Sequence, residues 1–311
     1  MRWLVAILLL LPVTANAQVG MPWPGPGTVH SAGGGGFTGS GDAVAGASGY
    51  YGLFAYTSAL RGTKAINLCL SPGNIDTLCQ DVNSDPTTGI VSSTQVISGT
   101  TCGTTFATNA CTIKTWYDQT TSGIGNITQT GPGNRAQFVP NFNGTIPAAC
   151  STGTTGLNQA LYFGGTFAPS AISFSMAYVE RSTPGGNARV MWNAGSGGAG
   201  IIFGINVTPA AVIYNGGFNG APIAITNNTW LAMVGTSAAG GGAVALYVNG
   251  STDTTGGSGG TTPGGNIGIL SDTGSSNDGC GTEFRYDGSV LSSGNAATLI
   301  TNMRSAGRNN F

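Results

Sequence analysis

The chain alternates short runs of β-branched, aromatic and aliphatic residues with turns rich in Gly, Ser, Thr and Asn. In the run 172–180, Ile172, Phe174, Met176 and Tyr178 alternate with smaller residues, which is the period of a half-buried strand. Similar runs predict strands at 65–70, 112–117, 160–163, 189–193, 200–206, 211–214, 266–270 and 284–291. This succession of short strands predicts an all-β fold, a two-sheet antiparallel β-sandwich with short helices.

Three further segments add to this pattern. Residues 229–251 predict a hairpin whose second strand ends in Asn249-Gly250, a pair suited to a positive-φ turn. Residues 50–60 carry apolar residues near helical spacing and predict a helical turn or short helix. Near the end of the chain, Ser293 is a candidate N-cap for a short helix that continues to Met303.

The beginning of the chain differs in composition from the rest. Residues 1–17 combine Arg2, an apolar stretch and the small residues before Gln18, the pattern of a signal peptide cleaved near Ala17. Residues 18–48 are rich in Gly, Pro and Ser and predict a flexible leader. Residues 49–311 then form a single sandwich domain. We therefore expect a secreted or periplasmic protein.

Composition narrows the classes of partner. Only 7% of the residues are charged, the formal net charge is −1, and 54 residues are Gly. A chain with so little charge offers no field for phosphates, so nucleic-acid binding has no physical support. No segment after the signal peptide is long and apolar enough to span a bilayer, which needs about 20 residues. We expect a monomer that binds neither nucleic acid nor membrane.

Six cysteines remain in the mature chain, and export favours disulfides. Six cysteines permit fifteen pairings, and sequence order alone does not choose among them. Proximity suggests Cys69 with Cys79 and Cys102 with Cys111, which leaves Cys150 for Cys280. A zinc site is disfavoured because no cysteine pair has two-residue spacing and the sole histidine lies in the leader. No metal or organic cofactor is expected, although a structural calcium stays an open alternative.

A cysteine loop, an apolar strand and Tyr117-Asp118-Gln119 followed by a Gly/Asn turn form the most distinctive stretch, residues 102–129. Together with the segment 49–68, this stretch resembles the opening of the arabinofuranosidase B catalytic domain, a secreted glycoside hydrolase family. The hairpin at 229–251 resembles those of laminin-G-like and concanavalin A-like jelly rolls. The resemblance extends from Gly49 to the C-terminus and implies a sandwich that acts on arabinose-bearing plant polysaccharides.

The resemblance also implies a retaining mechanism with two carboxyl groups. Asp272, in a Gly/Ser/Asn loop after the strand 266–270, matches the family's acid/base, and Asp278 is a close rival. The family's nucleophile would precede the strand that begins near Ile201, but no carboxylate occurs between Glu180 and Asp253. Glu180 is therefore a substitute nucleophile candidate. The family's adjacent cysteine pair is also missing.

Two other carboxylates lie on one predicted strand. Glu283 and Asp287 have equal parity, so both could face the same side of a sheet. A structural salt bridge with Arg285 or Arg181 is the alternative to a functional role.

A sugar site would also need flat apolar faces and polar groups. Trp192 and Tyr214 are the favoured aromatic residues, and Asp118 and Asp278 are the candidate polar contacts. Three functions follow: a hydrolase resembling α-L-arabinofuranosidase, a non-catalytic glycan-binding sandwich, or a surface-attachment domain. The partner in the first two is an arabinose-containing polysaccharide.

Overall fold

The computed structural model describes residues 37–70, 78–97, 99–102, 111–121, 124–142, 146–151, 161–162, 167, 169–182, 184, 188–194, 200–215, 218–238, 243–254, 266–270, 278–305 and 308. All of them belong to one of the two compact units of the chain, Ala32–Phe311. The predicted signal peptide and His30 lie outside the described residues, as does the loop that carries Asp272.

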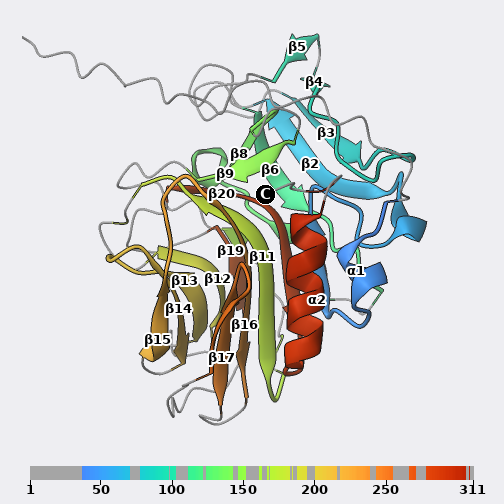
Figure 1. The fold of residues 1–311 in the computed structure, drawn as a ribbon. Helices are drawn as coiled ribbons and strands as arrows, with labels where there is room; N and C mark the ends of the chain where they lie inside the picture. Colours follow the sequence, from blue (N-terminus) through green and yellow to red (C-terminus); the bar gives the residue numbers. More distant parts are fainter. Residues whose placement is uncertain are drawn as a thin grey trace, which may run out of the picture. The chain divides into compact units, whose positions relative to one another are not determined.

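Antiparallel pairing builds two sheets, which confirms the predicted sandwich (Figure 1). The first sheet has, in spatial order, β18 (Ser251–Asp253), β17 (Val244–Val248), β16 (Trp230–Ser237), β11 (Ile172–Glu180), β20 (Gly279–Asp287) and β1 (Gly49–Gly52). The second has β3 (Leu78–Asn83), β2 (Lys64–Leu70), β6 (Cys111–Trp116), β7 (Ile127–Thr128), β10 (Leu161–Tyr162), β19 (Asn266–Ile269), β12 (Ala188–Ala194), β13 (Ile201–Ile205), β14 (Ala210–Asn215) and β15 (Phe218–Ala224).

Two short strands connect the sheets. β8 (Gln137–Val139) pairs with β6 and with β9 (Ala148–Cys150), which in turn pairs with β20. Cys150 faces Cys280 in this register, and the two form a disulfide. The bonds Cys69–Cys79 and Cys102–Cys111 are also present, so all three predicted disulfides are confirmed.

Aromatic side chains fill the space between the sheets. Trp116 from the second sheet meets Phe284 from the first, edge to face, with ring centroids 5.8 Å apart. Phe174 packs on Tyr286 in the same way at 5.4 Å. Such pairs add about 0.5–1.5 kcal/mol each beyond the burial of their area. Side chains alternate along a strand, so the residues of β11 and β20 that lie between these core positions point to the opposite face of the first sheet.

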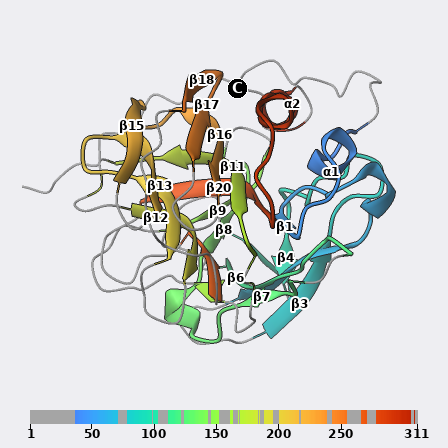
Figure 2. The ribbon, with the colours of Figure 1, turned by 90° about the horizontal axis from the view of Figure 1, so that it is seen from below.

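That opposite face is covered by the helix α2 (Ser293–Arg304), which packs over β11, β16 and β17 (Figures 1 and 2). Its buried positions are Ala296, Leu299, Ile300 and Met303, which belong to one hydrophobic cluster with Ala177 of β11. All nine residues of β11 are consequently buried, whereas the sequence predicted a half-buried strand. The cap of the helix is Ser292 rather than Ser293, because its hydroxyl accepts a bond from Asn295 N–H.

The predicted helix at 50–60 is wrong in its first half. Gly49–Gly52 is a strand, β1, and only Ser58–Leu60 forms a short 3-10 helix, η1. Tyr51 faces the space between the sheets, while Tyr50 packs with Tyr56 on the other side. Apolar residues at consecutive positions thus reflect a strand covered on both faces.

Two polar segments are also more ordered than their composition suggests. Leu78–Asn83, a mostly polar stretch for which no strand was predicted, forms β3 and pairs with β2. In the predicted leader, residues 37–48 carry the short helix α1 (Ser40–Ala43), and Arg285 donates hydrogen bonds to the carbonyls of Ser40 and of the C-cap residue Val44. The packed part of the chain therefore begins before Gly49.

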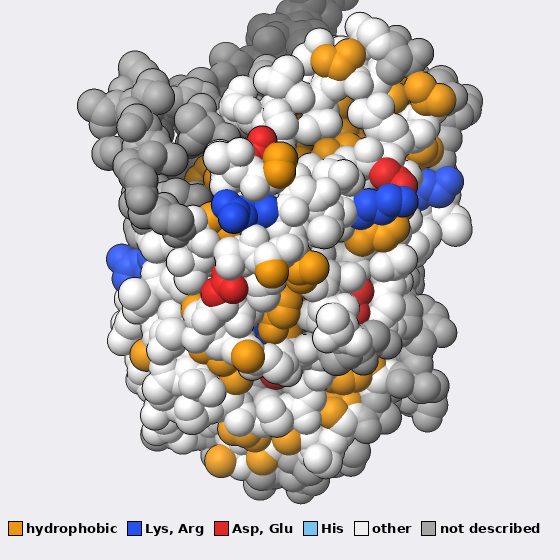
Figure 3. All heavy atoms as spheres, turned by 90° about the vertical axis from the view of Figure 1, so that its right-hand side faces the viewer, with side chains coloured by type: hydrophobic (Ala, Val, Ile, Leu, Met, Phe, Trp, Pro, Cys, Tyr) orange, Lys and Arg blue, Asp and Glu red, His pale blue; other side chains and the backbone are white. Residues whose placement is uncertain are grey.

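The remaining strands are a pair outside both sheets, β4 (Val96–Ile97) and β5 (Thr100–Thr101), and a second 3-10 helix, η3, spans Pro132–Asn134. No helix among the described residues has the length and apolar character needed to cross a membrane. One face of the molecule shows charged side chains only in small separate groups among polar and apolar ones (Figure 3). This agrees with the low charge of the sequence.

Candidate functional site

Glu180 is the last residue of β11, and its carboxyl lies on the same side of the strand as Tyr178, facing the space between the sheets. The side chain is fully buried. Tyr178 Oη donates a hydrogen bond of 2.7 Å to Glu180 Oε2, while Oε1 is buried without a hydrogen-bond partner. A buried carboxyl oxygen that the fold does not use is costly, so it points to a functional role.

Burial raises the pKa of Glu180 to about 8. The Tyr178 hydroxyl opposes this rise by donating to the carboxyl, whereas the negative charge of Asp278 adds to it. At neutral pH the carboxyl therefore carries a proton for most of the time. Strongly perturbed carboxyl groups of this kind are concentrated at functional sites.

Asp278 lies beside Glu180, because Glu180 is paired with Gly279 at the start of β20. The Asp278 carboxylate forms an ion pair with Arg181, and its backbone carbonyl accepts a 2.8 Å bond from Arg181 N–H. The structure thus brings together two of the carboxylates that the sequence singled out. Of the two, Glu180 is the one with a buried oxygen, Oε1, that lacks a hydrogen-bond partner.

Trp192 and Tyr214 lie in one row across the second sheet. Gly268 of β19 pairs with Trp192, Trp192 with Ile202, and Ile202 with Tyr214. The neighbours Phe203 and Ile213 face the interior, so this row lies on the outer face of the sheet. Its two aromatic residues come from β12 and β14, as expected of a surface that stacks against a sugar.

Gly268 makes room for the indole of Trp192. A Cβ at this position would lie 2.4 Å from the ring, far inside van der Waals contact. Trp192 is 7% exposed and Tyr214 is partly buried, so both rings are already packed on at least one side.

Asp118 serves a turn. Its carboxylate accepts bonds from Tyr50 N–H at 3.2 Å, from the N–H and hydroxyl of Thr120, both at 2.9 Å, and from Gly125 N–H at 3.3 Å. The adjacent Gln119 is buried and bridges the backbone of the segment 52–56. The turn that begins at Tyr117 therefore holds β1 in place. These contacts add no support for sugar binding by Asp118.

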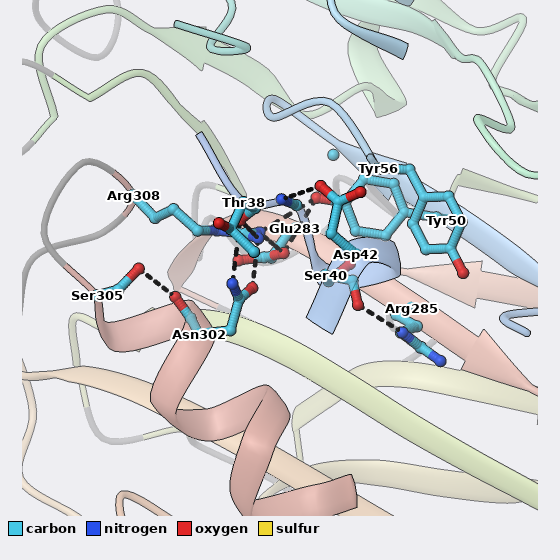
Figure 4. Close-up of polar contacts among 12 residues, drawn as sticks. Thr38, Ser40, Asp42, Tyr50, Tyr56, Glu283, Arg285, Asn302, Ser305 and Arg308 are labelled. Carbon is cyan, nitrogen blue, oxygen red and sulfur yellow. Dashed lines mark hydrogen bonds and ion pairs between the residues drawn. The ribbon is translucent and has the colours of Figure 1, made fainter. Parts of the chain in front are cut away.

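Glu283 and Asp287 share one face of β20, as their parity predicted, and both are in buried salt bridges. Arg285 binds Asp287 with two bonds of 2.7 and 2.9 Å. Glu283 pairs instead with Arg308, near the C-terminus, and accepts a 3.0 Å bond from the Tyr50 hydroxyl (Figure 4). Both carboxylates therefore form structural salt bridges, which was the alternative to a functional role. Arg308 is a partner that the sequence did not suggest.

Asp272 lies outside the described residues, between the end of β19 and Asp278 in the sequence. Its role as acid/base stays a prediction. Among the residues that the structure describes, no three His, Cys, Asp or Glu side chains lie close enough together to hold a metal ion.

A groove of about 480 Å³ runs between α2 and the hairpin of β17 and β18. It is lined by Tyr247, Gly250, Thr252, Ala297, Ile300, Thr301, Arg304 and Ser305. None of the candidate residues from the sequence lines this groove. The turn of the same hairpin has the predicted positive φ angles, 48° at Asn249 and 97° at Gly250.

Comparison with known proteins gives a relationship at the level of the fold. No family model and no curated protein matches the sequence. A GH54 α-L-arabinofuranosidase soaked with a cyclic sulfate inhibitor is 15% identical, with a TM-score of 0.58 over 83% of this chain and 62% of its own. An arabinofuranosidase complexed with arabinofuranosyl-α-1,2-xylobiose is 14% identical, with a TM-score of 0.60 over 86% of this chain and 64% of its own.

These similarities show that the chain shares its β-sandwich fold with these two structures. The chain spans less than two thirds of the length of these structures. A mutant GH54 enzyme soaked with 4-nitrophenyl α-L-arabinofuranoside superposes with a TM-score of 0.55 at 14% identity. At such identities the fold alone is shared, and the chemistry has to be argued from this chain's own residues.

Tyr178 is the residue at this site that the sequence did not single out. It lies two positions before Glu180, so on a strand the two side chains share a face. That spacing was readable in the sequence. What it could not reveal is that both side chains are fully buried.

Proposed function

We propose that this protein is a secreted carbohydrate-active enzyme that hydrolyses terminal α-L-arabinofuranosyl groups of plant polysaccharides. The observation that carries the proposal is Glu180, a carboxyl group with a raised pKa and one oxygen that the fold leaves without a hydrogen bond. The fold shared with arabinofuranosidases over 83–86% of the chain supports the choice of sugar.

Hydrolysis of a glycoside normally needs two carboxyl groups, one protonated and one ionised. The resemblance in sequence supplies Asp272 and Glu180 for this pair. Asp278 is less suited to act chemically because Arg181 holds its carboxylate. Trp192 and Tyr214 are the residues proposed to contact the sugar, since their strands place them in one row on the outer face of the second sheet.

The test is turnover of 4-nitrophenyl α-L-arabinofuranoside by the mature chain. We expect release of nitrophenol by the wild type and a loss of at least about 100-fold in kcat for Asp272→Asn and for Glu180→Gln. Asp253→Asn, on the β18 strand, is the matched control and should keep wild-type activity. A wild type without turnover on arabinofuranosides would refute hydrolysis.

A second candidate function is glycan binding without hydrolysis. It is favoured by the contacts of seven described carboxylates, which serve turns or salt bridges: Asp42, Asp81, Asp85, Asp118, Asp278, Glu283 and Asp287. Calorimetric titration with arabinoxylan oligosaccharides decides between the two. Binding that Trp192→Ala abolishes and Tyr117→Phe preserves, with no sugar released, would establish this second function. Absence of both turnover and binding would favour an attachment role.

We further propose that the protein is exported and acts as a monomer. The three disulfides fit an oxidising compartment. Mass spectrometry of protein secreted by the expressing cell should show a chain that begins at Gln18, and size-exclusion chromatography should give the mass of one chain. An intact Met1 in the secreted product would contradict cleavage near Ala17.

A further inference from the structure

We propose that the groove between α2 and the hairpin of β17 and β18 is a second carbohydrate-binding site, which takes a neutral sugar ring. It lies on the outer face of the first sheet, whereas Trp192 and Tyr214 lie on the outer face of the second (Figure 2). The groove is therefore separate from the candidate active site. Only the choice of arabinoxylan as a probe rests on the proposed function.

Tyr247 forms the floor of this groove. It pairs with Val234 on one side and with Thr252 on the other, so the three side chains share the face of the sheet that α2 covers. The volume of about 480 Å³ is within the range of small-molecule sites, about 300–1,000 Å³. The groove is open at the turn of the hairpin, where a Cβ added at Gly250 would meet no atom within 4 Å.

The Tyr247 side chain is unusual because its polar end lacks a partner. The residue is 9% exposed, so nine tenths of it is buried. Its hydroxyl makes no hydrogen bond to the described part of the chain, and this oxygen is not a fully buried atom. The hydroxyl is thus the part of the side chain that reaches the groove, where it can both donate to a ligand and accept from it.

The opposite wall comes from one stripe of α2. Ala297, Thr301 and Arg304 are three or four residues apart, so they follow one another along the same side of the helix. The Thr301 hydroxyl donates to the Ala297 carbonyl over 2.9 Å, and the Ser305 hydroxyl donates to the Asn302 carbonyl over 2.7 Å. Their protons are engaged within the helix, and their oxygens are left as acceptors.

These polar groups disfavour a charged ligand. An anion needs donors, but the Thr301 and Ser305 oxygens can only accept. Arg304 is the one charged residue among the described residues that line the groove. It donates to the Asn249 carbonyl over 3.3 Å and lies in the last turn of α2, where its charge offsets the partial negative charge of the helix end. The same guanidinium repels a cation.

A sugar ring matches this set of groups. Its hydroxyls donate to the Thr301 and Ser305 oxygens and accept from Tyr247 and Thr252, while its C–H face packs on the exposed methyl of Ala297. Hydrogen bonds between neutral groups contribute modestly, so the site is weak by itself. Together with the candidate active site it gives the protein two contacts with one polysaccharide, which raises the overall affinity.

The test is an NMR titration of the mature Trp192→Ala chain with an arabinoxylan pentasaccharide, because this substitution removes the first candidate sugar site. We expect the amide signals of residues 250–252 and 297–305 to shift and to saturate. Tyr247→Phe removes only the hydroxyl and should weaken the binding about threefold to tenfold. An unchanged affinity in Tyr247→Phe would overturn the role of that hydroxyl.

A blocking variant tests the groove itself. Ala297→Trp should abolish the shifts, because the indole fills the groove from an exposed position of α2. Asn295→Trp is the matched control, since residue 295 is also exposed on α2 but does not line the groove, and it should leave the titration unchanged. Shifts that persist in Ala297→Trp, or that occur only at other residues, would overturn the site.

Two comparisons complete the test. An oligogalacturonate that shifts the same signals at lower concentration than the neutral pentasaccharide would overturn the choice of a neutral ligand. Turnover of 4-nitrophenyl α-L-arabinofuranoside tests the proposed function separately, and the groove variants should keep it because this substrate is too small to reach both sites. Groove binding without turnover would refute hydrolysis and leave this site standing, whereas turnover without groove shifts would refute this site alone.

Discussion

Replacing Glu180 by glutamine should flatten the pH dependence of the free energy of unfolding. Burial raises the pKa of this carboxyl from 4.5 to about 8, so between these values the folded chain keeps a proton that the unfolded chain releases. The stability that this group contributes is complete below pH 4.5 and is lost as the pH rises, at about 1.4 kcal/mol per pH unit. Between pH 5.5 and 7.5 the wild type should lose about 2–3 kcal/mol through Glu180.

Glutamine suits this experiment because it keeps the size of the side chain and an oxygen for the Tyr178 hydroxyl, and it has no charge to bury. Urea unfolding of both proteins at the two pH values, with disulfides intact, gives the four free energies. Burial also raises the pKa of Asp287, but that group is present in both proteins and cancels in the difference. Equal losses of stability in wild type and Glu180→Gln would refute the raised pKa and with it the neutral carboxyl.

Three further predictions concern the structure around the candidate site. Arg308→Met should cost about 3–5 kcal/mol in urea unfolding because it leaves Glu283 charged and buried, and adding Glu283→Gln should recover part of that loss. Serine at both Cys150 and Cys280 should cost about 4–5 kcal/mol, because the bond closes a loop between residues 130 apart; a loss below about 1 kcal/mol would contradict this entropic account. Asp118→Asn should lower the melting temperature and leave the KM for an arabinofuranoside unchanged, since its contacts are internal; a higher KM would restore a role in sugar binding.

The sandwich could be predicted because its local signals agree with its tertiary structure. The strand 172–180 has the same bounds in the sequence pattern and in β11, and Asn249-Gly250 forms its turn where the backbone requires positive φ. Cys69 and Cys79 could be paired by proximity because they are direct partners in neighbouring strands. In each case the information lies within about ten residues of chain.

Features set by distant segments could not be read in the same way. The segment at Tyr50 looked helical because burial on both faces of β1 removes the alternation that marks a strand. The full burial of β11 depends on α2, more than a hundred residues later, and small residues such as Ser175 leave room for it. The partner of Glu283 was expected among Arg285 and Arg181, but it is Arg308, which the end of the chain brings back onto β20.

Distant segments also determine which carboxylates have a structural role and which are candidates for a chemical one. Sequence spacing can place Glu180 and Glu283 on strands, but whether an acid is neutralised depends on a cation that arrives from elsewhere in the fold. Glu283 receives Arg308 and is committed to stability, whereas Arg181, the residue next to Glu180, binds Asp278 instead. Glu180 is thereby left without a cation of its own, and the Tyr178 hydroxyl donates a hydrogen bond to one of its oxygens. An acid that the fold buries and does not neutralise costs stability, and perturbed acids of this kind are concentrated at functional sites, which is the reason for proposing a chemical role for Glu180 rather than for Glu283.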